Sequence, residues 1–195
     1  MFGDDDPDTL HAAHHLATCL YLVGAFEQAR QLNEDTLARR RRVLGDDHID
    51  VQRSASRLAT NLRELGEVEA ARHLHEDVLA HRQRVLGNDH PATINTADRL
   101  GCDLYSLGQV DAARRLHEDS LTRARRVLGN DRLITMNCAN NLVELKAARE
   151  LSTDTVARAR EVFGEDHPRT WKAADNLAAA RRFLGEAEPL VNYTT

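Results

Sequence analysis

The apolar residues of this chain recur at the spacing of an α-helix that buries one face. Near the N-terminus, Ala13, Leu16, Ala17 and Leu20 stand at positions i, i+3, i+4 and i+7. Residues at these positions share one side of a helix, and apolar residues there are typical of a helix packed against a core. We therefore expect a helix here that buries these four side chains.

Two later segments carry the pattern clearly and are separated by a glycine. The first, residues 91–107, is predicted to be a helix that buries Ala97, Leu100 and Leu104. The second, residues 109–128, is predicted to be a helix with an apolar face of its own. Its expected buried residues are Ala112, Leu116, Ser120 or Leu121, and Val127.

A longer period relates such helix pairs to one another. The tripeptide Val-Leu-Gly ends at Gly45, Gly87 and Gly129, each 42 residues after the last, and Gly3 precedes the series by the same interval. Self-similarity at a fixed period of this size is the signature of a repeat architecture. We expect a single array over residues 1–195, with repeats at 3–44, 45–86 and 87–128, a shortened repeat at 129–163 and a partial repeat at 164–195.

The segment GNDHP at residues 87–91 combines a glycine, polar groups, a histidine and a proline, as a catalytic or metal-binding loop does. It returns as GDDHI at residues 45–49 and as GEDHP at residues 164–168, with weaker copies at residues 3–7 and 129–133. A catalytic loop is rarely copied into every repeat of one chain, whereas every helix needs an end. We interpret the glycine as the end of one helix and the aspartate with proline as the start of the next.

The recurring motifs resemble the tetratricopeptide repeats of kinesin light chains. They read LG-x-D-H-P-x-T, then A-x-N-L-A, then L-G, then A-R-x-L-x-E-D-x-L. Similar arrays occur in bacterial multi-repeat proteins, often as the sensing arm of a large signalling ATPase. The resemblance implies an all-α solenoid of tetratricopeptide-type helix-turn-helix repeats. It also implies a right-handed superhelix whose first helices line a concave groove.

The fourth repeat is shorter than the others, because Gly164 follows Gly129 by 35 residues. The loss removes the turn between its two helices, and the junction around Lys146 contains no residue typical of a tight turn. We predict one continuous helix from about Thr135 to Val162, with a tight bend at Glu144-Leu145 as the alternative.

The array also looks like a fragment of a longer one. We expect a homodimer through exposed repeat ends or through the shortened repeat.

Composition and charge exclude several classes of protein. Charged residues make up 29% of the chain and aromatic residues 4%, with Ala, Leu, Arg and Glu prominent, which favours helices. A net charge of −5 gives no reason to expect nucleic acid or an acidic membrane surface as a partner. No apolar run approaches the ~18 residues that span a bilayer, and no signal peptide follows Met1. Cys19, Cys102 and Cys138 form no CxxC pair, so we expect free thiols and a cytoplasmic protein.

Polar residues opposite the apolar stripe of each first helix predict a binding groove. In the resembling family this face lines the groove, and Asn or basic residues there hold an extended peptide. The first three repeats carry His or Arg instead, and arginines in this place would suit carboxylates. The alternative is that these positions are only a solvated helix face. The predicted groove residues are His11, His15, Arg53, Arg57, Asn95, Arg99, Asn137, Asn141, Lys172 and Asn176.

We expect the histidine clusters and the basic run to have structural roles. HAAHH at residues 11–15 has a spacing that a metal ion could use, but no third ligand is placed with it. HEDVLAH at residues 75–81 fails the HExxH pattern of zinc proteases. The run Arg39–Arg42 is interpreted as a solvated helix end balanced by acidic residues, as in the i,i+4 pair of Asp35 and Arg39. We expect no metal and no cofactor.

These observations favour a non-catalytic scaffold that binds a protein or peptide in the groove. An acidic protein or peptide is one option for this partner. No phosphate-binding loop, nucleophile elbow or Cys–His pair is present in the sequence. The first alternative is the regulatory arm of a larger signalling ATPase. The second, less favoured, is a small metal-dependent enzyme.

Overall fold

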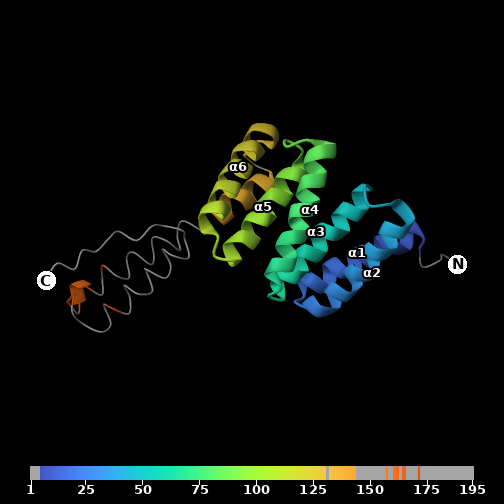
Figure 1. The fold of residues 1–195 in the computed structure, drawn as a ribbon, viewed down its shortest axis with the longest axis horizontal. Coiled ribbons are helices and arrows are strands. Elements are labelled where there is room, and N and C mark those ends of the chain that lie inside the picture. The colour runs from blue at the N-terminus through green and yellow to red at the C-terminus, as the bar shows by residue number, and fades with distance from the viewer. Residues whose placement is uncertain are drawn as a thin grey trace. The chain divides into compact units, whose positions relative to one another are not determined.

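The computed structural model describes residues 5–130 and 132–143, together with residues 157, 160–162, 164–165 and 171. All regular secondary structure in these residues is helical, which confirms the all-α prediction (Figure 1). A further helical stretch follows the labelled helices at residues 133–143. The helices are α1 (Pro7–Leu22), α2 (Phe26–Leu44), α3 (Ile49–Glu64), α4 (Val68–Leu86), α5 (Pro91–Ser106) and α6 (Val110–Leu128).

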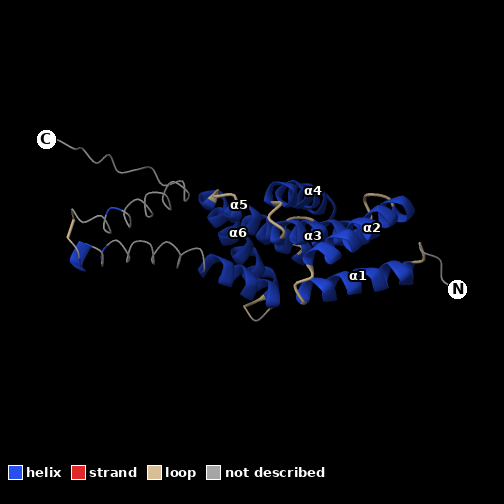
Figure 2. Ribbon diagram, turned by 90° about the horizontal axis from the view of Figure 1, so that it is seen from below, coloured by secondary structure: helices blue, strands red, loops and turns tan. Residues whose placement is uncertain are grey.

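Helices follow each other in pairs of one shorter and one longer helix, as the repeat period predicts. The predicted helices 91–107 and 109–128 agree with α5 and α6 to within one residue at each end. In sequence order, α1 packs on α2, α2 on α3 and α3 on α4 (Figure 2). The chain divides into two compact units, residues 1–103 and 104–195.

The second helix of each complete repeat ends at a glycine whose backbone conformation is nearly closed to other residues. Gly45, Gly87 and Gly129 have φ of 79°, 82° and 84°, with ψ of 160°, 165° and 174°. This combination of positive φ with extended ψ is essentially restricted to glycine. The interpretation of the recurring loop as a helix end is therefore confirmed.

The residue that opens the next helix is a histidine in two of the repeats, where we expected an aspartate. The Nδ1 atom of His48 accepts a hydrogen bond of 3.1 Å from the backbone N–H of Asp50, and His90 does the same for Ala92. In the first repeat an aspartate, Asp6, takes this place. An imidazole nitrogen satisfies a free N–H of the first turn as an N-cap oxygen does.

The core of the first unit runs through α2, α3 and α4. It contains Leu37, Val51, Ala55, Leu58, Leu62, Ala71 and Val78, with Leu74 packed against it. On α1, Leu10 and Ala17 are buried, but Leu16 is 55% exposed, so the predicted stripe is wrong at this position. The equivalent Leu58 is 8% exposed because α2 covers that side of α3, whereas the described residues place no helix on that side of α1.

The burial of α6 also differs in part from the prediction. Ser120 and Leu121 are buried as expected, but Val127 is 45% exposed near the last turn. Ala112 and Leu116 are only half-buried, since the buried face runs one residue further along. It comprises Val110, Ala113, His117, Ser120, Leu121 and Ala124.

Two pairs of buried polar side chains join successive repeats at equivalent positions. Between α2 and α3, Asn33 donates to Asn61 at 2.7 Å. One repeat later, His75 on α4 meets Asp103 at 2.5 Å, and Arg63 reaches the other carboxylate oxygen of Asp103 at 3.3 Å. Buried polar groups need such partners. Both repeats therefore have a polar contact at this position, formed by two amides in one repeat and by an aspartate with basic side chains in the next.

The prediction for the shortened fourth repeat concerns residues that lie partly outside the described ones. The continuous helix from Thr135 to Val162, and its alternative bend at Glu144-Leu145, cross residues that lie outside the described ones. In the described part of the chain, Cys19, Cys102 and Cys138 are not joined in disulfide bonds. Among the described helices, none combines the length and the apolar character that a membrane crossing requires.

Candidate functional site

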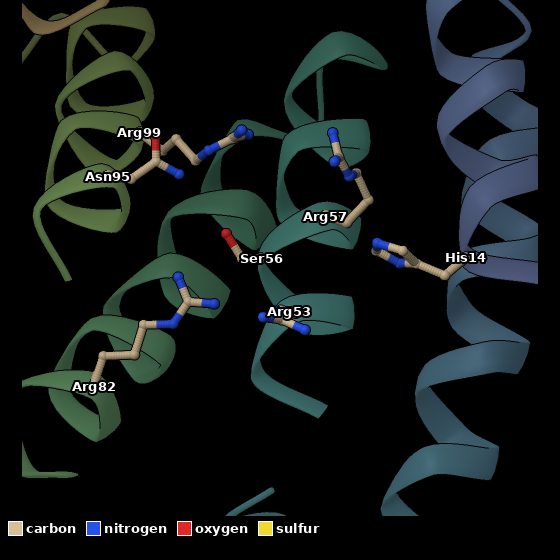
Figure 3. Close-up of a pocket in the computed structure, with 7 residues that line it drawn as sticks. All are labelled: His14, Arg53, Ser56, Arg57, Arg82, Asn95 and Arg99. Atoms are coloured by element: carbon tan, nitrogen blue, oxygen red, sulfur yellow. The ribbon is translucent and has the colours of Figure 1, made fainter. Parts of the chain in front are cut away.

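A cavity of about 260 Å³ opens in the first unit between its first helices. Its lining comes from α1, α3 and α5, with one residue from the second helix α4 (Figure 3). The lining residues share a preference for positive charge or for hydrogen bonding, and none is acidic. They are His14, Arg53, Ser56, Arg57, Arg82, Asn95 and Arg99.

Helical spacing places most of these side chains. Arg53 and Arg57 are one turn apart on α3, as Asn95 and Arg99 are on α5, so each pair faces the same way. Ser56 is buried and lies between the two arginines of α3 in the sequence. The repeat thus presents two polar positions from each of two successive first helices.

Arg82 reaches the cavity from α4 and is almost fully buried. Its guanidinium donates to the hydroxyl of Thr96 at 2.6 Å and to the carbonyl of Ala92 at 3.1 Å. Burial, together with the nearby charges of Arg99 and Arg53, lowers the pKa of Arg82 to about 10. It remains protonated at neutral pH, so a cation is held in a site that disfavours it.

The residue equivalent to Arg82 in the preceding repeat is Arg40, which corrects our interpretation of the basic run. Arg40 is 2% exposed, where we expected a solvated side chain. It donates to Ser54 at 2.8 Å and to the carbonyl of Leu10 at 3.1 Å. In both repeats, the arginine at this position hydrogen-bonds to a neighbouring helix.

The rest of the basic run follows the predicted pattern of pairing with acidic residues. Arg39, Arg41 and Arg42 pair with Asp35, Asp46 and Asp5.

Arg99 and Arg57 carry positive charge, and neither has an acidic partner among the residues that the structure describes. Arg99 donates to the hydroxyl of Thr60, and its pKa is lowered by burial first and then by the charges of Arg57 and Arg63. Within the described part of the chain, Arg57 makes no hydrogen bond or ion pair. Of the four cavity arginines, Arg53 alone pairs with a carboxylate of a described residue, that of Asp50 at 3.0 Å.

His14 is the α1 residue of the cavity, and it is neutral at physiological pH. Burial and the positive charges of Arg40 and Arg57 lower its pKa to about 4, with smaller contributions from His15 and His11. Its Nδ1 atom is buried without a hydrogen-bond partner among the described residues. The cavity therefore joins a neutral imidazole to three guanidinium groups that have no carboxylate partner in the described part of the chain.

Four of the predicted groove residues, Arg53, Arg57, Asn95 and Arg99, come together in this cavity. His11 and His15 do not line it and are exposed on α1, with ring centroids 5.8 Å apart. Within the residues that can be described, no group of three or more His, Cys, Asp or Glu side chains is arranged to hold a metal ion.

The remaining predicted groove residues lie elsewhere. Asn137 is exposed and Asn141 is half-buried, both on the helical stretch at residues 133–143 of the second unit. Lys172 and Asn176 lie outside the described residues. The second unit has a more open cavity of about 480 Å³, which neither asparagine lines; its residues are Arg125, Asn130, Thr135, Met136, Ala139 and Asn140.

Sequence reasoning missed three lining residues, for two different reasons. His14 and Ser56 occupy the same repeat position, one residue before the predicted His15 and Arg57, so a wider view of the helix face would have found them. Arg82 sits on a second helix, and only the packing of α4 against α5 brings it to the cavity. A buried arginine gives no sequence signal of its own.

Comparison with known proteins identifies the repeat. Models of the tetratricopeptide repeat family match residues 9–50, 50–125 and 135–169. Among solved structures, the kinesin light chain nearly identical TPR-like repeats of Podosopora anserina are 24% identical, with a TM-score of 0.65 over 92% of this chain and 89% of that chain. BtubC (BKLC) from P. vanneervenii is 19% identical, with a TM-score of 0.65 over 97% of this chain and 70% of that chain.

A third similar structure is that of the Rap protein complexed with competence and sporulation factor. It is 15% identical, with a TM-score of 0.52 over 92% of this chain and 54% of that chain. No curated protein matches the sequence. At these identities the structural likenesses show a shared fold, so the function has to be argued from the site.

Proposed function

The chain belongs to the tetratricopeptide repeat family, with repeats of the kinesin-light-chain-like type, and on this premise we propose that it is a non-catalytic scaffold for an acidic partner. The partner is a protein or peptide segment whose carboxylates enter the cavity between α1, α3 and α5. One observation carries the proposal: four arginines line the cavity and no acidic residue does.

The energetic argument is that the cavity holds cations at a cost in folding free energy that an acidic ligand would relieve. Arg82 and Arg99 are desolvated and repelled by neighbouring arginines. A carboxylate in the cavity would supply the charge-assisted, bidentate hydrogen bonds that guanidinium groups form well. Arg53, which is exposed at the cavity, would add electrostatic attraction during the approach of the ligand.

The non-catalytic part of the proposal rests on the chemistry of the lining. Arginine side chains neither take up nor release protons near neutral pH, so they cannot serve as general bases. The fold itself supports a binding role, since the structurally similar Rap protein is described in complex with competence and sporulation factor. Tetratricopeptide repeats generally act as scaffolds for proteins or peptides.

Fluorescence anisotropy with a labelled hexaglutamate peptide tests this proposal. We expect binding that weakens as salt rises, because exposed charge pairs are screened. Arg57→Gln should weaken binding about tenfold, since the variant removes one charge-assisted contact. Arg57 has no described partner to lose, so the substitution should leave the fold intact.

The matched control is Arg39→Gln, which removes the same charge from an ion pair on α2 that does not line the cavity. This control should bind the peptide as the wild type does. If both variants lose affinity equally, the attraction is due to overall charge and the cavity is not the binding site. If the wild type does not bind at low salt, the proposal of an acidic partner fails.

A further inference from the structure

The cavity has more positive charge than one carboxylate can balance. Arg57, Arg82 and Arg99 have no carboxylate within ion-pair distance among the described residues, whereas Arg53 has Asp50. Arg82 and Arg99 donate only to neutral oxygens, those of Thr96, Ala92 and Thr60. His14 adds no charge near pH 7, because its pKa is about 4. The excess is therefore close to three positive charges.

The hydrogen-bond donors of the lining suit an ionic ligand with several acceptor oxygens. Arg57 has all of its donors free within the described part of the chain, and Asn95 offers a further amide on the α5 side (Figure 3). A carboxylate brings one charge and two oxygens. A phosphoryl group brings ~−1.5 to −2 charges at neutral pH and three strong acceptor oxygens, which matches the number and type of groups present.

The size of the cavity is compatible with such a ligand and the side chain that carries it. Its volume of about 260 Å³ corresponds to about nine water molecules at the ~30 Å³ that each occupies in the liquid. The guanidinium groups come from three helices and lie on different sides of the cavity (Figure 3).

We propose that this cavity is a receptor for a phosphoryl group, and that the scaffold distinguishes a phosphorylated segment from an unmodified acidic one. The proposal rests on the proposed function, since it names the chemistry of the group that enters the same cavity. The phosphoryl group is carried on a serine or threonine side chain of the partner. A free phosphate compound has the same chemistry and is separated from it by the experiment.

The experiment compares four labelled peptides with one neutral Gly-Ser background. The variable position holds serine, phosphoserine, one glutamate or two adjacent glutamates, so the phosphoserine and two-glutamate peptides have nearly equal charge. We expect phosphoserine to bind about tenfold more tightly than two glutamates, because one tetrahedral dianion meets several guanidinium groups at once. Arg57→Gln should remove most of this difference, and Arg39→Gln should keep it.

Competition by sodium phosphate, against sodium chloride at equal ionic strength, identifies the source of the group. Displacement of the phosphoserine peptide at millimolar phosphate supports the phosphoryl site. If phosphate binds and the phosphoserine peptide does not, the site is for a small phosphate compound. Equal affinity for phosphoserine and two glutamates overturns the phosphoryl proposal but leaves the acidic partner standing. Failure of hexaglutamate, phosphoserine and phosphate to bind overturns both.

Discussion

The exposed arginines of the second helices and two of the cavity arginines, Arg57 and Arg99, have opposite surroundings. On α2, α4 and α6, arginine is repeatedly placed one turn from an acid, as in Arg39 with Asp35 at 2.8 Å, Arg72 with Glu76 at 2.8 Å and Arg123 with Asp119 at 2.7 Å. Around the cavity, Arg57 and Arg99 have no such acid among the described residues. The same residue type therefore stabilises helices in one region and leaves positive charge unbalanced in the other.

The difference has a physical meaning, because the sequence supplies acids freely. The chain contains 31 acidic residues against 26 lysines and arginines, so an arginine without a carboxylate is not explained by a shortage of partners. Uncompensated, partly buried charge opposes folding. Such charge is expected where a ligand supplies the missing partner, which is the reason for placing the function in the cavity.

The largest expected loss of stability comes from removing a carboxylate that pairs with buried basic side chains. Asp103→Ala removes the carboxylate shared by His75 and Arg63, and Asp103 is fully buried. We expect the free energy of unfolding to fall by ~3–5 kcal/mol, since a charge is left buried without its partner. Urea denaturation followed by circular dichroism measures this loss.

The preceding repeat offers a control for that variant. The double variant His75→Asn with Asp103→Asn reproduces the amide pair of Asn33 and Asn61 at the equivalent positions. It should lose less stability than Asp103→Ala, because the two amides can hydrogen-bond to each other. A double variant as unstable as Asp103→Ala would show that the site requires the charge.

A smaller effect is expected from the pH dependence that His14 confers. Its pKa is about 4 in the folded protein and 6.5 in an unfolded chain, so between these values the unfolded state binds the proton more tightly. The free energy of unfolding should therefore decrease as pH falls from about 6.5 towards 4. We expect ~1 kcal/mol, after discounting for the partial solvent exposure of the side chain.

Urea denaturation at pH 7 and pH 5 measures the effect in the wild type, in His14→Gln and in His15→Gln. The first variant should have a smaller pH dependence than the wild type. The second removes an exposed histidine that does not line the cavity and contributes little to the pKa of His14, so its pH dependence should stay close to that of the wild type. Identical pH dependence in all three proteins would contradict the lowered pKa of His14.

The fold was more predictable from the sequence than the site, for identifiable reasons. Helix ends were placed to within one residue because Gly87 and its equivalents adopt a backbone conformation nearly closed to other residues. The burial of Leu16 was wrong because a periodic pattern shows which face is apolar but not whether another helix covers it. Arg53, Arg57, Asn95 and Arg99, which line the cavity, were predicted from helical spacing together with the resemblance, which implied that this helix face lines a groove.

The other half of the site depends on packing between helices. Arg82 and Arg40 are arginines at equivalent positions, and both are buried. Only Arg82 lines the cavity, because its surroundings include Arg53 and Arg99 from α3 and α5. Repeat position alone would have assigned both the same role. Long-range packing of this kind has no periodic signal in the sequence.

A surface ion pair should contribute little to the free energy of unfolding, and its removal tests the compensated side of the comparison. Arg39→Gln removes the pair with Asp35 on α2, where both side chains are partly exposed. We expect the free energy of unfolding to fall by ~0.3–0.5 kcal/mol at low salt, as for other i,i+4 pairs on helices. Thermal or urea denaturation at two salt concentrations measures it. A loss that persists in high salt would mean that the side chain also stabilises by packing.

The smallest effect, and the one with the opposite sign, is expected for Arg57→Gln. Arg57 has no described partner, and its charge lowers the pKa of both Arg99 and His14. Removing that charge relieves repulsion, so the free energy of unfolding should stay unchanged or rise by ~0.2–0.5 kcal/mol at low salt. The pKa of His14, followed by NMR titration, should rise from about 4 because one of the nearby cations is gone. Arg39→Gln should leave that titration as it is in the wild type. If Arg57→Gln instead destabilises the protein as much as Arg39→Gln does, Arg57 is compensated in the folded chain, and the contrast between the two regions is wrong.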